Sequence, residues 1–198
     1  MTTQLLIATT NPGKLREYAA IFADLPYALV TLRDLGVTID VEETGATFAD
    51  NAELKARFYA DHTGMRALAD DSGLCVDALD GAPGVYSARY AGHGASDADR
   101  MALLLRNLAD VPDAARTARF VCTIAIATPD GACAFVDGVL KGQIGHEPRG
   151  DHGFGYDPIF VPRGETRTLA EIPPDEKNAM SHRARAARAA RIVLQDAV

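Results

Sequence analysis

The sequence predicts an α/β fold with a mixed β-sheet. Three observations support this prediction: apolar strand-like segments alternate with segments of helical spacing, a long β-hairpin follows in the second half, and no repeat or linker interrupts the chain. A hairpin pairs its strands antiparallel, so the sheet cannot be purely parallel. We expect one domain over residues 1–198, without independently folding parts.

The first predicted unit is a strand, a tight loop and a helix. Residues 5–9 are apolar and form the strand, and Asn11-Pro12-Gly13 breaks it. A helix follows because apolar residues then recur at helical spacing, at Leu15, Tyr18, Ala19 and Phe22.

Two further helices have start signals in the sequence. Thr47 is followed three residues later by Asp50, and Ser96 is followed in the same way by Asp99. A hydroxyl residue at the N-cap and an acidic residue three positions on stabilise the first turn of a helix. Helices are therefore expected to begin directly after Thr47 and Ser96.

The remaining strands surround these helices. Residues 67–69 read as a short buried strand that ends in Asp70-Asp71-Ser72-Gly73, which places the acidic pair at a strand end. Residues 118–128 and 134–144 alternate in polarity around a Pro-Asp-Gly turn and predict the hairpin. The chain then continues with a glycine-rich loop (150–157), an apolar stretch (158–161) and a terminal helix that ends in Ile192-Val193-Leu194.

Composition excludes several classes of protein. The formal net charge is −7, which argues against binding to a nucleic-acid backbone. Cys75, Cys122 and Cys133 lie in apolar runs, as expected of reduced thiols in a core. No segment reaches the roughly 20 apolar residues that span a bilayer, and no leader pattern opens the chain. We expect a cytoplasmic protein without a membrane partner.

The first loop is a candidate phosphate site. It consists of Thr9, Thr10, Asn11, Pro12, Gly13 and Lys14. Backbone N–H groups at a helix start and one lysine favour a phosphate there. The loop lacks the glycine spacing of a P-loop, and the alternative is a simple turn with a solvated Lys14.

Two acidic pairs are candidate ligands for Mg²⁺. Glu42-Glu43 and Asp70-Asp71 are each followed by a hydroxyl residue and a glycine. Mg²⁺ needs only one or two carboxylates, because water and substrate phosphate fill its other positions. The alternative is that the acidic residues cap neighbouring turns, more so for Glu43 and Asp70 than for their partners.

Two segments are candidates for base recognition. Phe154 and Tyr156 alternate with glycines before Asp157, and an aromatic ring between glycines can stack on a base. The alternative is that both rings fill the core beneath the loop, and a division of roles, with one ring inward and one at the site, also fits the pattern. Lys177, Ser181, His182 and Arg183 are expected near the start of the terminal helix, where His182 and Arg183 can donate to a base carbonyl. The arginines that follow at spacings of three, Arg185, Arg188 and Arg191, are expected to be a solvated stripe.

Taken in order, these segments resemble the inosine/xanthosine triphosphate pyrophosphatase family, house-cleaning enzymes that remove non-standard purine nucleotides. Five blocks carry the resemblance from Leu6 nearly to the C-terminus: residues 8–14, residues 42–45 with Phe48 and Asn51-Ala52, residues 69–92, residues 154–158, and Lys177 with Ser181-His182-Arg183. The resemblance implies an elongated fold of two lobes with a substrate cleft between them, in a homodimer.

The resemblance also implies roles for individual residues. Thr9 through Lys14 would hold the triphosphate, and Glu42 and Asp71 would bind Mg²⁺. Asp71 would also be the catalytic base, and Ser72 would contact the substrate. Nucleotide and base recognition would fall to Phe154, Gly155, Tyr156, Asp157, Lys177, His182 and Arg183. Two residues depart from the family pattern, Thr10 and His152, where glycine is more usual.

The implied reaction is hydrolysis of ITP, dITP or XTP to the monophosphate and pyrophosphate, by attack of water on the α-phosphorus. Donors such as Arg183 or a backbone N–H would select the 6-keto oxygen. One alternative is a pyrophosphatase with a different base preference. The other is a regulatory protein that binds nucleotides without turnover, which the four acidic residues at positions 42, 43, 70 and 71 argue against.

Overall fold

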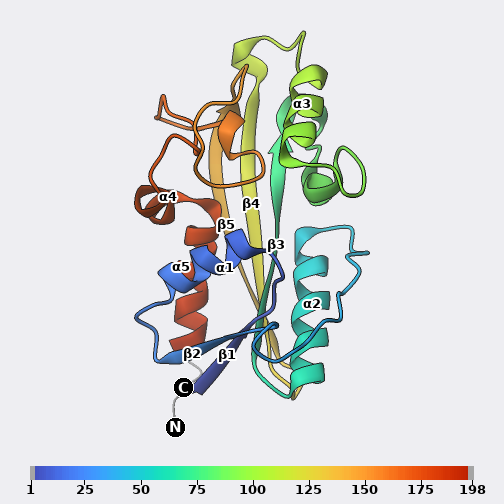
Figure 1. Ribbon diagram of the computed structural model, residues 1–198, viewed down its shortest axis with the longest axis vertical. Helices are drawn as coiled ribbons and strands as arrows, with labels where there is room; N and C mark the ends of the chain where they lie inside the picture. Colours follow the sequence, from blue (N-terminus) through green and yellow to red (C-terminus); the bar gives the residue numbers. More distant parts are fainter. Residues whose placement is uncertain (1–2, 196–198) are drawn as a thin grey trace. The chain divides into compact units, whose positions relative to one another are not determined.

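The computed structural model describes residues 3–195, which form one sheet and its flanking helices (Figure 1). The strands of the described chain lie in the order β2-β1-β3-β4-β5-β6. Their bounds are β1 (Thr3–Ile7), β2 (Tyr27–Thr31), β3 (Ala67–Val76), β4 (Thr117–Ala127), β5 (Cys133–Ile144) and β6 (Phe160–Pro162). The α-helices are α1 (Pro12–Ile21), α2 (Phe48–Thr63), α3 (Asp97–Asn107), α4 (Pro174–Met180) and α5 (His182–Gln195).

The sheet is mixed, as predicted. Strand β1 is parallel to both β2 and β3, whereas β5 and β6 are antiparallel. Strands β4 and β5 are neighbours joined by a tight turn, in which the N–H of Gly131 donates to the carbonyl of Thr128 at 2.9 Å. The predicted α/β class and the hairpin are therefore confirmed.

The chain divides into two compact units. Unit 1 contains the described parts of Met1–Asp71, Cys122–Gly138 and Arg183–Val198, and unit 2 contains Ser72–Val121 and Val139–His182. Strands β3, β4 and β5 contribute residues to both units. The predicted limits of the single domain, residues 1 and 198, lie outside the described residues.

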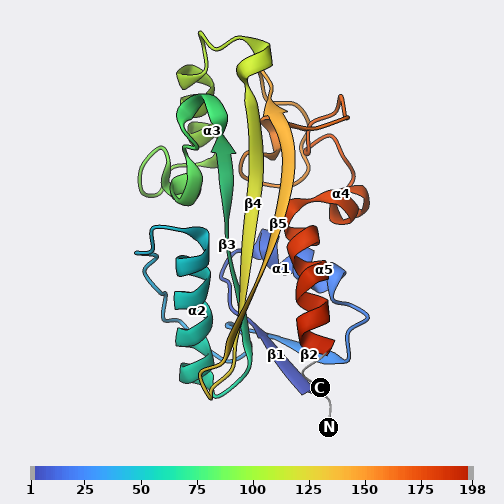
Figure 2. The same cartoon turned by 180° about the vertical axis from the view of Figure 1, so that it is seen from behind.

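Unit 1 packs helices on both faces of its part of the sheet. Successive side chains of a strand point to opposite faces, and the cores follow this alternation. Helices α1 and α5 cover one face and α2 covers the other (Figures 1 and 2). The α1/α5 core contains Leu5, Ile7, Tyr18, Phe22, Leu68, Ile124, Ala187 and Leu194, among others. The α2 core contains Leu6, Ala8, Ala52, Ala56, Tyr59, Ala67, Ala69 and Ala125, among others.

Unit 2 has a core of its own. Its strands bury the even-numbered residues of β3, β4 and β5 against α3 and the glycine-rich loop. The core includes Leu74, Val76, Leu104, Leu108, Ala118, Phe120, Leu140, Tyr156, Ile159 and Phe160. The odd-numbered residues of β4 and β5 therefore face the opposite side of the sheet in this unit.

The helix starts predicted from the capping signals are confirmed. The side chain of Thr47 accepts from the N–H of Asp50, and the Asp50 carboxylate accepts from the N–H of Thr47. Ser96 and Asp99 make the same reciprocal pair before α3. Each cap stabilises its helix by about 1 kcal/mol.

Three local predictions were wrong or incomplete. The acidic pair is inside strand β3, not at its end, because β3 continues to Val76. Lys177 belongs to a separate short helix, α4, because the extended backbone of Ser181 (ψ 159°) ends α4 before α5 begins. Strand β2 was not predicted from the sequence.

Other predictions agree with the structure. Cys75 and Cys122 are buried, Cys133 is half-buried, and no disulfide links them. Arg185 and Arg188 are exposed on α5. Arg191, predicted to belong to the same solvated stripe, is instead half-buried and pairs with Asp24 of unit 1. Within residues 3–195, no helix is both long and apolar enough to span a bilayer.

Candidate active site

The two adjacent aspartates of β3 point to opposite faces of the sheet. Leu68 belongs to the α1/α5 core, whereas Ala67 and Ala69 belong to the α2 core. The alternation of the strand therefore sends Asp70 toward α1 and α5, and Asp71 toward α2. Both carboxylates are nearly buried, with 1% and 5% of the residue exposed. Each consequently has its own set of partners.

Asp70 is paired with cations from the two helices on its face. Its Oδ2 lies 2.8 Å from Nζ of Lys14 and 3.6 Å from Nε of Arg183. Arg183 also donates to Glu17 of α1. Burial by itself raises the pKa of Asp70, but Lys14, Arg183 and Lys55 outweigh it and hold this pKa well below its ordinary range. Asp70 is therefore ionised and positions Lys14.

The thiol beside Asp70 is not a nucleophile. Sγ of Cys122 lies 3.7 Å from Oδ2 of Asp70. Burial and the Asp70 charge raise the pKa of this thiol far above its ordinary value, which keeps it neutral. Because the thiolate is the reactive form, covalent catalysis by Cys122 is not supported.

Asp71 is held by an asparagine from the first turn of α2. Nδ2 of Asn51 donates to Oδ2 of Asp71 at 3.0 Å, and Oδ1 of Asn51 accepts from the N–H of Gly45 at 2.7 Å. Asn51 is fully buried. A Cβ at position 45 would lie 2.7 Å from Oδ1 of Asn51, so only glycine fits there. One amide thus fastens the acidic loop at residues 42–45 to the Asp71 carboxylate.

Lys55 lies one turn further along the same side of α2. Its Nζ pairs with Glu43 and donates to the carbonyl of Asp70 at 2.7 Å. Burial lowers the pKa of Lys55, but Glu43, Asp70 and Asp71 outweigh it and raise this pKa, so the ammonium stays charged. Burial raises the pKa of Asp71, and Glu43 adds to this effect while Lys55 opposes it.

The chemistry of these residues fits a hard divalent cation. Asp71 is a buried carboxylate whose charge is disfavoured by its surroundings, and Glu42 is exposed in the loop that Asn51 fastens. The described residues contain no group of three or more His, Cys, Asp or Glu side chains placed to hold a metal. Mg²⁺ does not require such a group, since water and phosphate oxygens complete its shell.

The first loop caps helix α1. Oδ1 of Asn11 accepts from the N–H groups of Gly13 and Lys14 at 2.8 and 3.1 Å, and Oγ1 of Thr9 accepts from the N–H of Asn11. The Asn11 side chain thus satisfies two of the N–H groups expected to face a phosphate. Thr10 and Pro12 are exposed beside them.

A second group of predicted residues lies together in unit 2. Asp157 is 3% exposed and accepts from Nζ of Lys177 at 2.7 Å and from the N–H of Phe154 at 2.9 Å. The Lys177 ammonium lies 5.1 Å from the centre of the Phe154 ring. At Gly153 (φ 76°), a Cβ would lie 2.1 Å from Oδ2 of Asp157. This ion pair therefore fixes the loop and the half-buried Phe154 ring.

The two aromatic rings of this loop are placed differently. Tyr156 is 4% exposed and donates from its hydroxyl to the carbonyl of Ser87, so it is the inward ring. The N–H of Gly155 donates to Asp97 at 2.7 Å. His182 is buried and stacks on Phe120 with 4.7 Å between ring centres. Ser72 is half-buried in β3.

Sequence reasoning missed several members of these groups. Asn51 and Lys55 were not assigned to the site, although two polar residues four apart on the apolar side of a helix are a signal in the sequence. Glu17 and Asp97 were also missed. Their carboxylates meet partners far along the chain, at Arg183 and Gly155, so no local pattern marks them.

The molecule is thus an α/β protein with charged groups on the central strand of a mixed sheet. The profile of the Ham1 family matches residues 5–192, and the chain belongs to this family. The resemblance inferred from the five sequence blocks is confirmed.

Named relatives agree with this assignment. The chain is 53% identical over 189 residues to the dITP/XTP pyrophosphatase of Streptomyces coelicolor, covering 94% of each protein. It also resembles the solved structure of a HAM1 protein from Coxiella burnetii, at 44% identity and a TM-score of 0.89, covering 98% of this chain and 99% of that one. A solved nucleoside-triphosphatase, dITP/XTP pyrophosphatase, from Mycobacterium abscessus is 49% identical with a TM-score of 0.77, covering 95% and 97%.

Proposed function

We propose that this chain is a dITP/XTP pyrophosphatase, which hydrolyses non-standard purine nucleoside triphosphates (dITP, ITP and XTP) to the monophosphate and pyrophosphate. The observation that carries the proposal is the match of nearly the whole chain to relatives with this name, at 53% and 54% sequence identity. We further propose a single catalytic domain that works as a cytoplasmic homodimer, as the family resemblance implies.

The charged groups of unit 1 would handle the triphosphate. Lys14 and Lys55 bring two ammonium groups to Asp70, and both are mostly buried, where charges interact more strongly than in water. Thr9 through Lys14 would hold the phosphates at the start of α1. Glu42 and Asp71 would hold Mg²⁺, which when bound would offset charge on the phosphates and the leaving group.

Asp71 would act as the general base. It would accept a proton from the water whose oxygen attacks the α-phosphorus, while the bond from that phosphorus to the bridging oxygen breaks and pyrophosphate leaves. A raised pKa makes a carboxylate a better proton acceptor. Asn51 would keep the Asp71 carboxylate in one orientation, and Ser72 would contact the substrate.

The residues of unit 2 would recognise the nucleotide. Phe154 offers an aromatic face in a loop fixed by Asp157 and Lys177, and backbone groups at Gly155 would complete this surface. Tyr156 would support the loop from inside, and His182 would donate to the base. Arg183 remains our proposed donor to the 6-keto oxygen, although in this structure it pairs with Glu17 and Asp70.

Pyrophosphate release from ITP, XTP, dITP, GTP, ATP and the pyrimidine triphosphate CTP tests this function. We expect rapid release from the first three with Mg²⁺, and almost none after chelation. Adenine lacks the 6-keto acceptor, and an unpaired polar contact costs about 1–3 kcal/mol, or roughly 5- to 150-fold in rate. Equal rates with GTP or pyrimidine triphosphates would support the alternative base preference. No release from any of them would reject enzymatic activity.

Replacing Asn51 with alanine is expected to lower kcat by about 10- to 100-fold, the usual effect of removing a group that orients a metal ligand. KM should change little, because Asn51 is proposed to act through Asp71 and not on the substrate. The matched control is Asn107→Ala, since Asn107 is exposed and its amide donates to Tyr90. If both variants lose the same small amount of kcat, Asn51 has no positioning role.

A further inference from the structure

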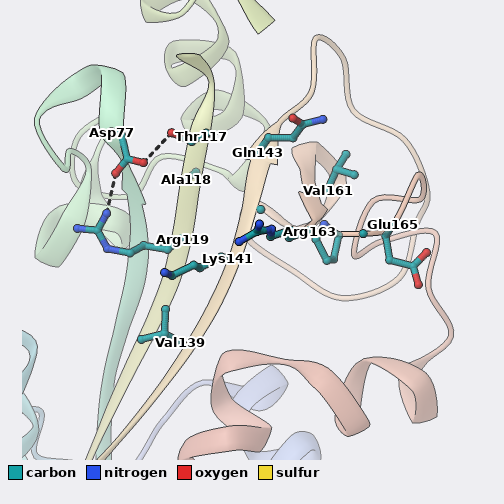
Figure 3. Close-up of a pocket in the computed structure, with 13 residues that line it drawn as sticks. Asp77, Thr117, Ala118, Arg119, Val139, Lys141, Gln143, Val161, Arg163 and Glu165 are labelled. Carbon is teal, nitrogen blue, oxygen red and sulfur yellow. Dashed lines mark hydrogen bonds and ion pairs between the residues drawn. The ribbon is translucent and has the colours of Figure 1, made fainter. Parts of the chain in front are cut away.

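Unit 2 carries a charged cavity outside the proposed active site. It has a volume of about 770 Å³ and lies on strands β4, β5 and β6 (Figure 3). Arg119 belongs to β4, Lys141 to β5, and Arg163 directly follows β6. Val139, Gln143 and Val161 lie with them in the lining. Because Phe120 and Leu140 point into the core of unit 2, these odd-numbered residues share the outer face of the sheet. We call this cavity the basic basin.

Two of the three cations face each other directly. Strands β5 and β6 are antiparallel, with Gln143 opposite Val161, and the N–H of Arg163 donates to the carbonyl of Lys141 at 2.9 Å. Lys141 and Arg163 are therefore cross-strand neighbours, and like charges in this position repel each other. Within residues 3–195, neither cation has a carboxylate within ion-pair distance.

The acidic residues of the basin are already paired with cations other than Lys141 and Arg163. Asp77 accepts from Arg119 and from Thr117, each at 2.7 Å. Figure 3 marks both interactions with dashed lines. Glu165 accepts from Arg167 at 3.2 Å. The local excess of positive charge thus falls on Lys141 and Arg163, in a chain whose net charge is −7.

We propose that the basic basin binds a phosphate-bearing anion that bridges Lys141 and Arg163. A single anion between the two cations removes their repulsion, and the guanidinium of Arg163 can bond two phosphate oxygens at once. Gln143 supplies an amide donor beside the cations, and the volume suits a ligand up to the size of a nucleotide. This inference does not depend on the proposed function.

The test is an NMR titration of the full chain at constant ionic strength, with chelator present and with inorganic pyrophosphate or AMP as the probe. We expect saturating shifts of the amides in residues 139–143 and 161–165. A stronger response to pyrophosphate would identify a free polyphosphate, and a stronger response to AMP would identify a nucleotide. The variant Lys141→Gln/Arg163→Gln should bind at least about ten-fold more weakly, the effect of losing charged hydrogen bonds.

The matched control is Arg33→Gln/Arg106→Gln, which removes the same charge from two exposed arginines outside the basin. It should bind like the unaltered chain. The proposal would be overturned if sulfate caused the same amide shifts, or if the shifts persisted in the Lys141→Gln/Arg163→Gln variant. Either result would mean that this surface is only a solvated face. Sedimentation would show whether the basin variant has lost a dimer that the unaltered chain forms. If the variant loses the dimer but still binds the anion, the proposal is overturned and the basin is an interface between copies of the chain.

Discussion

Replacing Asp71 with asparagine is expected to reduce kcat for dITP by about 10²- to 10⁴-fold, the contribution of a positioned general base. The protein should stay folded, because asparagine has nearly the same volume and keeps an oxygen that can accept from Asn51. The measurements are pyrophosphate release with Mg²⁺, and circular dichroism with urea unfolding for the fold.

The control for this prediction is Glu53→Gln, which changes a half-buried acidic residue of α2 that pairs with Arg57 at the surface. It should keep full activity. A folded Asp71→Asn protein that retains Mg²⁺-dependent hydrolysis would remove Asp71 from the catalytic role, and the base would have to be sought elsewhere in unit 1.

Replacing the neighbouring Asp70 with asparagine should instead destabilise the protein, by about 3 kcal/mol in the free energy of unfolding. The change removes the buried counter-charge of Lys14 and one of the carboxylates that face Arg183, which keeps its pair with Glu17. The measurement is urea unfolding of both proteins. The midpoint of the variant should fall while the slope of the transition stays the same, which identifies a change in stability. The pair of variants at positions 70 and 71 would therefore separate a stabilising carboxylate from a catalytic one.

The Asp70 effect should also depend on pH. The folded-state pKa of Asp70 is lowered by its cations, so its stabilisation is present above the unfolded-state pKa of about 3.9 and is lost as pH falls through the lower folded-state pKa. The difference between the two proteins should accordingly be full at pH 7 and shrink below pH ~4. A surface comparison, Asp24→Asn, should shift the midpoint much less, since it removes an exposed pair. An Asp70→Asn midpoint equal to that of the unaltered chain would contradict the prediction.

Local signals in the sequence predicted local structure well. The starts of α2 and α3 were predicted because both caps are made by residues three apart, at Thr47 with Asp50 and at Ser96 with Asp99. Similarly, a division of roles between Tyr156 and Phe154 fitted the pattern, and the structure shows that Tyr156 is the inward ring. The hairpin was also visible, because its turn and both strands are continuous in the chain.

The errors arose where distant segments decide the outcome. Ser72-Gly73 resembles a turn, yet β3 continues through it because the strand is paired inside the sheet, with β1 and β4 as neighbours. Strand β2 exists through its parallel pairing with β1, and such a contact leaves little trace in five residues. The partners of Asp70 come from positions 14 and 183, so its pairing could not be read from its neighbours.

The alternation of Asp70 and Asp71 also restricts how this gene can change. Inserting or deleting a single residue in β3 ahead of the aspartates would turn each side chain to the other face. The carboxylate meant for Asn51 would then meet Lys14 and Arg183, and the other would meet the α2 side. Length changes between homologous genes should therefore be absent from this strand and collect in the loops, such as the turn between β4 and β5.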